Sequence, residues 1–200
     1  MAQPGIRLEL LIGPTLPKPA PIEVLESLIE LEVNQQDRDR SGFQMTFSLG
    51  KNLKKSFKDY QLLLDGVFDP PNRVIITVII GFQRFILIDG IITFNQVVPS
   101  NQLGESRLIV TGEDISLKLD LEDKNATYPN LSDSEIVAEI LAIYEPYIKE
   151  RIVTDNQYQP AANKYITTQH ETDLEFIQRL AQRNGFIFEI TPSQKPGENK

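Results

Sequence analysis

The chain has 200 residues, enough for one or two domains, and its formal net charge is −8 at pH 7. Proteins that bind nucleic acid or anionic lipid usually carry a surplus of Lys and Arg. This acidic chain is therefore expected to bind neither. It contains no cysteine, which excludes disulfide bonds and thiolate chemistry. No apolar run approaches the ~18 residues of a membrane helix, and the N-terminus shows no Sec signal. We therefore expect no direct membrane insertion.

The first half of the sequence is rich in predicted strands. Residues Ile6 to Ile12 form the first candidate, and a proline-rich connector follows it, since proline removes a backbone donor. Apolar and polar residues alternate within Ile22 to Val33 and again within Phe43 to Leu49, which predicts two further strands. Apolar residues then recur at helical spacing from Leu53 to Leu64, which predicts a short helix.

The centre of the sequence, from Arg73 to Gly112, holds three apolar runs separated by turn residues. Their β-branched and aromatic side chains predict strands. In the first run, Val74 to Ile80, both alternating sets of side chains are apolar. Two interpretations stay open: both faces lie in a core, or one face meets a partner subunit. The candidate subunit interface consists of Ile75, Thr77 and Ile79, and the pattern does not decide which register faces inward.

The second half of the sequence predicts helices. Alternation over Ile115 to Leu119 extends the third central run as a strand. Two capping boxes follow, Ser132 to Glu135 and Thr172 to Glu175, and an apolar helical stripe begins after each. Residues Phe186 to Ile190 are expected to form a closing strand.

A search for chemistry yields no catalytic, cofactor or metal site. His170 is the single histidine, and no nucleophile or orienting carboxylate near it forms a known constellation. Residues Asp37 to Gly42 match the first half of a calcium loop, but Ser48 stands where the bidentate glutamate belongs. Asn125 and Asn130 begin glycosylation sequons, which without a secretion signal are interpreted as chance matches. We therefore predict that the protein is not an enzyme and needs no cofactor.

Three blocks of the sequence occur in a characteristic order. The first runs from Phe68-Asp69-Pro70-Pro71-Asn72-Arg73-Val74 to Asp89-Gly90, and the second from Leu108-Ile109-Val110-Thr111-Gly112 to Ser116. The third begins with the predicted helix at Ser132-Asp133-Ser134-Glu135-Ile136-Val137 and continues, after an irregular stretch, with the predicted helix from Glu171 to Ala181 and with Asn184-Gly185-Phe186. Over about residues 60 to 190 these blocks together resemble the phage late control protein D and VgrG-type baseplate hub family of contractile injection systems.

The resemblance implies an α+β fold with a structural role. Hubs of this family are trimers that carry small antiparallel β-barrels and join a hexameric inner tube to a trimeric spike. Residues 1–120 are then expected to form the first hub β-barrel, of the tube-initiator kind. Residues 121–200 would form a smaller inserted domain of helix, loop, helix and strand, incomplete at its C-terminus. Because the family continues into a second barrel, we expect either a truncated hub or one part of a split hub.

The expected function is therefore that of a non-catalytic hub component of a contractile injection system or phage-tail-like baseplate. Its expected partners are the inner tube protein and the spike and baseplate proteins, with a homotrimer in the full assembly. The particle is expected to assemble in the cytoplasm and then to be released or anchored. The alternative from a different class is a soluble carbohydrate- or peptide-binding β-domain with a helical appendage.

Overall fold

The computed structural model describes residues 5–36, 40–49, 66–102, 105–154 and 165–200. The helix predicted over Leu53 to Leu64 lies outside these residues. The chain divides into two compact units, and each is described by itself. Unit 1 contains Met1–Asp114 and Pro192–Gly197, and unit 2 contains Ile115–Thr191 and Glu198–Lys200. Within the described part of the chain, no helix has the length and apolar character needed to cross a membrane.

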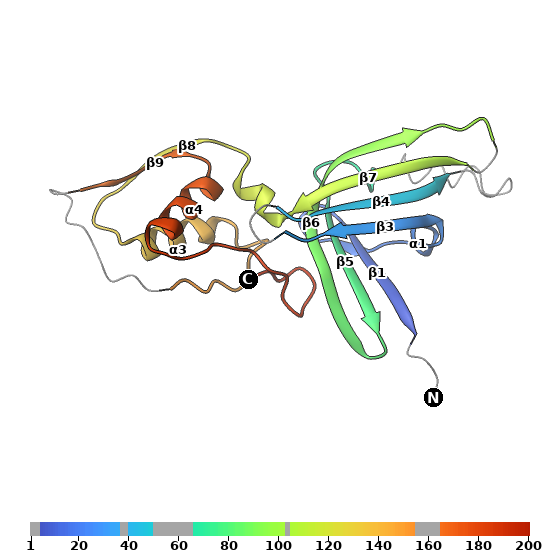
Figure 1. Cartoon of the computed structure of the whole chain (residues 1–200), viewed down its shortest axis with the longest axis horizontal. Coiled ribbons are helices and arrows are strands. Elements are labelled where there is room, and N and C mark those ends of the chain that lie inside the picture. Colours follow the sequence, from blue (N-terminus) through green and yellow to red (C-terminus); the bar gives the residue numbers. More distant parts are fainter. Residues whose placement is uncertain (1–4, 37–39, 50–65, 103–104, 155–164) are drawn as a thin grey trace. The chain divides into compact units, whose positions relative to one another are not determined.

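Unit 1 is built on a single antiparallel sheet of seven strands (Figure 1). Its elements are β1 (Ile6–Gly13), β2 (Lys18–Pro19), α1 (Ile22–Ser27), β3 (Leu28–Asn34), β4 (Gly42–Leu49), β5 (Arg73–Ile80), β6 (Gln83–Val98) and β7 (Ser106–Asp114). The strands lie in the order β2-β1-β5-β6-β7-β4-β3. The predicted α+β class is confirmed. Among the described residues the edge strands β2 and β3 do not pair, so closure into a barrel is not confirmed.

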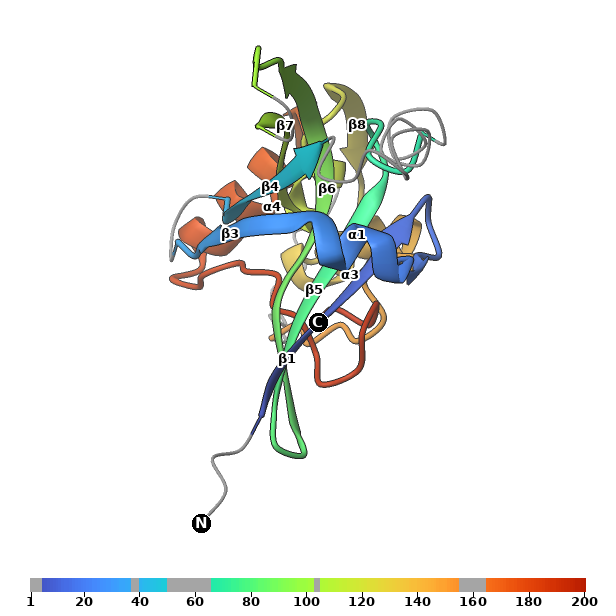
Figure 2. The same cartoon turned by 90° about the vertical axis from the view of Figure 1, so that its right-hand side faces the viewer.

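Strand β6 is the longest element, with 16 residues, and it belongs to two hairpins (Figures 1 and 2). Its first half pairs with β5 and its second half pairs with β7. The register shifts once in each half. In the pairing with β5 the shift lies between Ile76 and Thr77 of β5, and in the pairing with β7 it lies between Ile92 and Phe94 of β6. Such bulges bend a strand and increase its twist. Strand β6 therefore carries the sheet from the β5 hairpin to the β7 hairpin.

The core of unit 1 settles which register of β5 faces inward. Leu10, Ile76 and Ile88 are cross-strand partners, so their side chains share one face of the sheet. All three are buried in the same apolar cluster, together with Val74. The remaining buried members of this cluster are Ile12, Val24, Phe43, Met45, Phe47, Leu49, Phe68, Ile92, Leu108 and Val110. The inward register is therefore Val74, Ile76, Val78 and Ile80.

Two glycines make room for a core aromatic ring. A Cβ atom placed on Gly112 would overlap the carbonyl oxygen of Ile91 and the ring of Phe43. One placed on Gly90 would overlap the Glu113 carbonyl and lie 3.0 Å from Cε1 of Phe43. Since Phe43 is only 4% exposed, the ring has no free direction in which to move. Gly90 and Gly112 are thus required by close packing rather than by turns.

The strand prediction over Ile22 to Val33 is wrong for its first half. Residues Ile22–Ser27 form α1, and only Leu28–Asn34 form β3. Pro21 suits the position before a helix, because the missing N–H would have no helical partner there. The helix then buries Val24 completely in the core. Burial of this one side chain outweighs the weak alternation in the sequence.

Unit 2 combines two helices with a two-stranded sheet. Its elements are the 3-10 helix η1 (Ile115–Leu119), β8 (Lys124–Tyr128), α3 (Asp133–Ile143), β9 (Thr167–Glu171) and α4 (Asp173–Arg183). Both predicted helices are confirmed. Ser132 forms the complete capping box with Glu135, and the Thr172 hydroxyl accepts from the N–H of Glu175 at 3.2 Å.

Two strand predictions in this unit are wrong. Residues Ile115–Leu119 form η1, which buries Ile115 and Leu119 by its helical spacing. Residues Phe186 to Ile190 adopt neither helix nor strand and pair with no described strand. The pairing of β8 with β9 was not predicted, because neither segment has the apolar alternation of a half-buried strand.

A buried polar network fixes α4 to the rest of unit 2. The Asp173 side chain is 1% exposed, and its carboxylate accepts hydrogen bonds from Gln169 and Tyr144, each at 2.7 Å. Lys124 forms an ion pair with the same carboxylate. Burial, together with the hydrogen bond to Asp173, raises the pKa of Tyr144 above its ordinary value. Every group of this network has a partner inside the unit, which identifies it as a structural element.

Candidate assembly surfaces

Three strand ends project together from the sheet of unit 1, and we call them the finger. It consists of residues 6–9 of β1, 77–80 of β5 and 83–86 of β6, which are paired side by side. In both views these strands run beyond the ends of β3 and β4 (Figures 1 and 2). The turn at the tip is Gly81-Phe82, where Gly81 has a φ of 63°, a left-handed conformation that favours glycine.

One face of the finger continues the core face of the sheet. Ile6 pairs with Ile80, and Val78 pairs with both Leu8 and Phe85, so these side chains lie on the face that holds the buried residues further along. On the finger, Leu8 and Val78 are partly buried, and the side chains nearer the tip are exposed. Ile6 is 74% exposed, Ile80 42% and Phe85 46%, and Phe82 at the tip is fully exposed. This set of residues forms an apolar face, a feature typical of protein interaction sites.

The opposite face of the sheet holds the interface residues predicted from the sequence, with Thr77 and Ile79 on the finger and Ile75 just beyond it. Ile75 and Thr77 are fully buried within the single chain, and Ile79 is half-buried. A Cβ atom on Gly197 would lie 3.6 Å from Cδ1 of Ile75, so the segment Pro192–Gly197 of unit 1 reaches this face. The assignment of these residues to a subunit interface stays a prediction.

Charged residues surround Ile79 on this second face. Ile79 pairs with Arg7 on one side and with Arg84 on the other, so three side chains form a row across the finger. Arg84 lies 3.1 Å from a carboxylate oxygen of Glu9, and both side chains are partly exposed. Arg7 is exposed and has no ion pair among the described residues. The finger is therefore apolar on one face and cationic at the end of the other.

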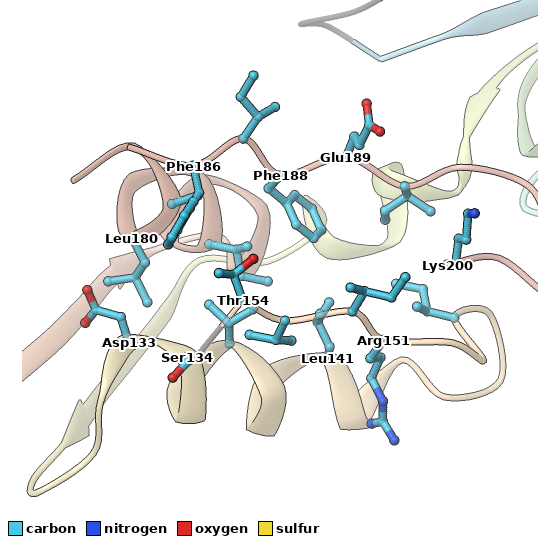
Figure 3. Close-up of a pocket in the computed structure, with 18 of the residues that line it drawn as sticks. Asp133, Ser134, Leu141, Arg151, Thr154, Leu180, Phe186, Phe188, Glu189 and Lys200 are labelled. Carbon is cyan, nitrogen blue, oxygen red and sulfur yellow. The ribbon is translucent and has the colours of Figure 1, made fainter. Parts of the chain in front are cut away.

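Unit 2 contains a groove of about 380 Å³ between α3, α4 and the segment after α4 (Figure 3). Its lining is mainly apolar and includes Val137, Leu141, Ile148, Val153, Ile177, Leu180, Phe188 and Ile190. Figure 3 shows that Phe188 points into the groove while Glu189 points away from it. Asp133, at one end, accepts hydrogen bonds from Arg183 and from Asn184, the latter at 2.6 Å. These hydrogen bonds hold the structure together at that end of the groove.

Of the polar residues singled out in the sequence, His170 and Asn125 lie together, whereas Asp37 to Asp39 of the calcium-loop match lie outside the described residues. Nδ1 of His170 lies 2.7 Å from Oδ1 of Asn125, a cross-strand pair between β9 and β8 on the surface. This pair places one glycosylation sequon in a strand. Among the described residues there is no group of His, Asp and Glu side chains that would hold a metal ion. The surface features that the described residues form are therefore an apolar face on unit 1 and a mainly apolar groove in unit 2.

The apolar face of the finger was not predicted from the sequence. The sequence showed only a polar break at Gln83-Arg84 between two apolar runs. An available signal was Phe82, because a large aromatic residue at a glycine turn has no core to enter. The groove in unit 2 left no such signal, since helix packing creates it.

Solved structures with a similar fold come from phage tails and type VI secretion machines. A tail protein from Neisseria meningitidis MC58 matches with a TM-score of 0.54 and 13% identity, over 98% of this chain and 49% of that chain. A chain of the Francisella PdpA-VgrG complex matches with a TM-score of 0.56 and 13% identity, over 98% of this chain and 31% of that chain. The E. coli c3393 protein, a component of the type VI secretion system, matches with a TM-score of 0.51 and 19% identity, over 86% and 47%.

These similarities define the class of fold as that of tail and VgrG-like baseplate proteins, and at such low identities they show the fold alone. The chain spans about half the length of these proteins or less. The family model of the Alg8 N-terminal domain matches residues 44–194. The chain therefore belongs to the Alg8 N-terminal domain family. No curated protein sequence matches it. The predicted resemblance is thus confirmed for the fold, while membership of the late control protein D and VgrG family is not.

Proposed function

We propose that this protein is a non-catalytic hub component of a contractile injection system or phage-tail-like baseplate. The observation that carries the proposal is the apolar face of the finger, where the core face of the sheet runs on into solvent. A protein that acted alone would be expected to cover or shorten such a surface. The fold shared with tail and baseplate proteins supports the same role.

In this proposal the protein joins a hexameric inner tube to a trimeric spike. Unit 1 supplies the first hub barrel, whose closure is completed in the assembly, and unit 2 is the inserted domain. The assembled form is a homotrimer. Of the predicted interface residues, Ile79 is the one left partly exposed to contribute to subunit contacts, because Ile75 and Thr77 are buried within the single chain. Assembly takes place in the cytoplasm, in a particle that is then released or anchored. Interfaces of this kind combine apolar burial with backbone pairing between strands.

Co-expression with the tube and spike proteins of the same system tests this role. The wild-type chain is expected to co-purify with them as a ring-like particle visible by electron microscopy. Ile80→Asp, on the finger, is expected to abolish co-purification because it places a charge in the apolar contact. Ile29→Asp on β3 is the matched control, since Ile29 is 46% exposed and Ile80 is 42% exposed. A monomeric wild-type chain that binds neither partner would overturn the proposal.

The groove of unit 2 favours the alternative, a peptide- or carbohydrate-binding domain. Its volume falls within the ~300–1,000 Å³ range typical of ligand sites. Its apolar lining suits a peptide side chain better than a sugar, whose hydroxyl groups need many polar partners. Phe186→Glu would place a charge in the groove at a residue that is 43% exposed, so unit 2 should stay folded, and it is expected to leave tube and spike binding intact if the hub role holds. A chain that stays monomeric at high concentration and retains a glycan or peptide would favour the alternative.

A further inference from the structure

We propose that the outer edge of β1 accepts an additional strand from a partner protein, in which apolar residues alternate with acidic ones. The inference rests on the proposed hub function and names the chemistry of a partner that binds the finger. Three features of residues 6–10 support it within the described part of the chain: backbone groups without a partner, apolar side chains that are exposed or partly exposed, and a cation without an ion pair.

The backbone of β1 has a free outer edge. β2 pairs with β1 only at Leu11 and Ile12, and the N–H of Ala20 donates to the carbonyl of Leu10 at 2.8 Å. Alternate residues of a strand direct their backbone groups to the same side. Those of Ile6 and Leu8 therefore point outward, away from β5, and no described residue bonds them. Unpaired groups of this kind are a template for β-augmentation.

The side chains beside this edge are apolar: Ile6 is exposed, and Leu8 is partly buried against the core cluster. Ile6 and Leu8 lie on the same face as Val78, Ile80 and Phe85. A strand added at the edge would place its alternate side chains next to those of Ile6 and Leu8. If those residues are apolar, the new strand extends the apolar face and buries part of it. A helix or a small ligand would leave the outward N–H and C=O groups of β1 unpaired.

The charge on the other face of β1 indicates which residues should alternate with the apolar ones in the added strand. Arg7 points to the face opposite Ile6 and Leu8, and it has no ion pair among the described residues. Glu9 already pairs with Arg84. An acidic side chain on the added strand would lie next to Arg7 and neutralise it. A second copy of this chain, paired antiparallel about Arg7, would bring two copies of Arg7 together. Paired about Leu8, it would place Arg7 opposite a Glu9 that Arg84 of its own chain already engages, so neither register offers Arg7 an unengaged carboxylate.

The other edge of the sheet does not offer the same site. Strand β3 exposes Glu30 and Glu32, and charged residues on an edge strand discourage pairing. Strand β2 is two residues long and contains Pro19. Among the described strands, the first half of β1 thus combines a free edge with a partly exposed apolar face.

The test uses the full chain and two short synthetic peptides, one in which valine alternates with glutamate and one in which valine alternates with lysine. Binding is read from the hydrogen exchange of the Ile6 and Leu8 amides, by NMR. The glutamate peptide is expected to slow exchange at both amides, and the lysine peptide is expected to bind at least tenfold more weakly. Equal binding of both peptides, or no protection of these amides, would overturn the proposal.

Two variants separate strand addition from general stickiness. Leu8→Pro removes an outward N–H but no bond to β5, so the fold is kept and the glutamate peptide is expected to bind at least tenfold more weakly than to Leu8→Ala. Arg7→Glu is expected to reverse the preference between the peptides. Circular dichroism and urea unfolding confirm that each variant is folded. Co-purification with tube and spike proteins, without protection at Ile6 and Leu8, would overturn strand addition and leave the hub function standing.

Discussion

Arg73 and Asp89 form a bidentate ion pair inside unit 1. Nε of Arg73 lies 2.7 Å from one carboxylate oxygen of Asp89, and Nη2 lies 2.7 Å from the other. The side chains are 1% and 2% exposed. Arg73 also donates to the carbonyls of Thr15 and Gly197, each at 3.1 Å. One guanidinium therefore ties β5 and β6 to two segments that are distant in the sequence.

We expect Asp89→Leu to destabilise unit 1 by about 3–5 kcal/mol, because it leaves the guanidinium buried without its counter-charge. The free energy of unfolding in urea measures the effect. Glu9→Gln is the control, since the Arg84–Glu9 pair has side chains 50% and 29% exposed, and exposed pairs contribute about 0–1 kcal/mol. Equal losses for the two variants would show that Arg73 finds solvent or another partner.

Gly112→Ala is expected to lower stability by about 1–3 kcal/mol or more, since the added methyl group overlaps the Ile91 carbonyl and the Phe43 ring. Thermal unfolding would show the loss as a lower Tm. Gly5→Ala serves as the matched control, because a Cβ atom there has no neighbour within 4 Å. An unchanged Tm for Gly112→Ala would mean that the sheet shifts easily at this point.

Much of the fold could be predicted from local patterns. The apolar runs around Val74 and Leu108 became β5 and β7, and the capping box at Ser132 began α3 as expected. Failures occurred where tertiary contacts decide. Val24 enters the core and imposes a helical turn on a segment with weak alternation. The β8–β9 pair has no apolar signal, because polar contacts to Asp173 hold it in place.

The candidate surfaces were less predictable than the strands. The sequence identified β5 as unusual because both of its alternating sets of side chains are apolar. It did not indicate which set faces the core. Both registers are buried near Val74, and membership of the main apolar cluster decides between them, because Val74 and Ile76 belong to it and Ile75 does not. The exposed part of that same register, at Ile80, could not be recognised locally, since exposure depends on where the neighbouring strands end.

Acid is expected to weaken the contact between α3 and α4. Burial alone raises the pKa of Asp133, but the hydrogen bonds from Arg183 and Asn184 outweigh it, so the pKa lies below its ordinary value of 3.8. A depressed pKa means that the ionised form stabilises the folded state above the unfolded pKa. This stability is lost as the pH falls through the folded value. The loss therefore falls in the acid range below 3.8.

Asp133→Asn tests this directly. The Tm difference between wild type and variant is expected to be present at pH 7 and to disappear at strongly acidic pH. Glu145→Gln provides the comparison, because the Lys149–Glu145 pair is exposed on both sides and should matter little at any pH. A difference that persists unchanged into strong acid would show that Asp133 acts only through packing.

Thr77→Val is expected to stabilise the isolated chain by about 1 kcal/mol. Thr77 is fully buried, and its hydroxyl has no hydrogen-bond partner among the described residues. Valine has nearly the same shape and removes an unsatisfied polar group, whose burial is unfavourable. Urea unfolding provides the measurement, and Thr111→Val, on the partly buried β7, is the comparison. A loss of stability would show that a bound water satisfies the hydroxyl of Thr77.

Ile79→Asp tests whether the predicted interface residues meet another subunit. Ile79 is half-buried and lies between Arg7 and Arg84, so a carboxylate there gains two cationic neighbours and the isolated chain should stay folded. Assembly with tube and spike proteins should fail, because the charge would be buried in the subunit contact. Ile75→Asp is expected instead to unfold the chain, since Ile75 is fully buried already. If Ile79→Asp assembles as well as wild type, this face is not a subunit contact, and only the apolar face of the finger remains as the assembly surface.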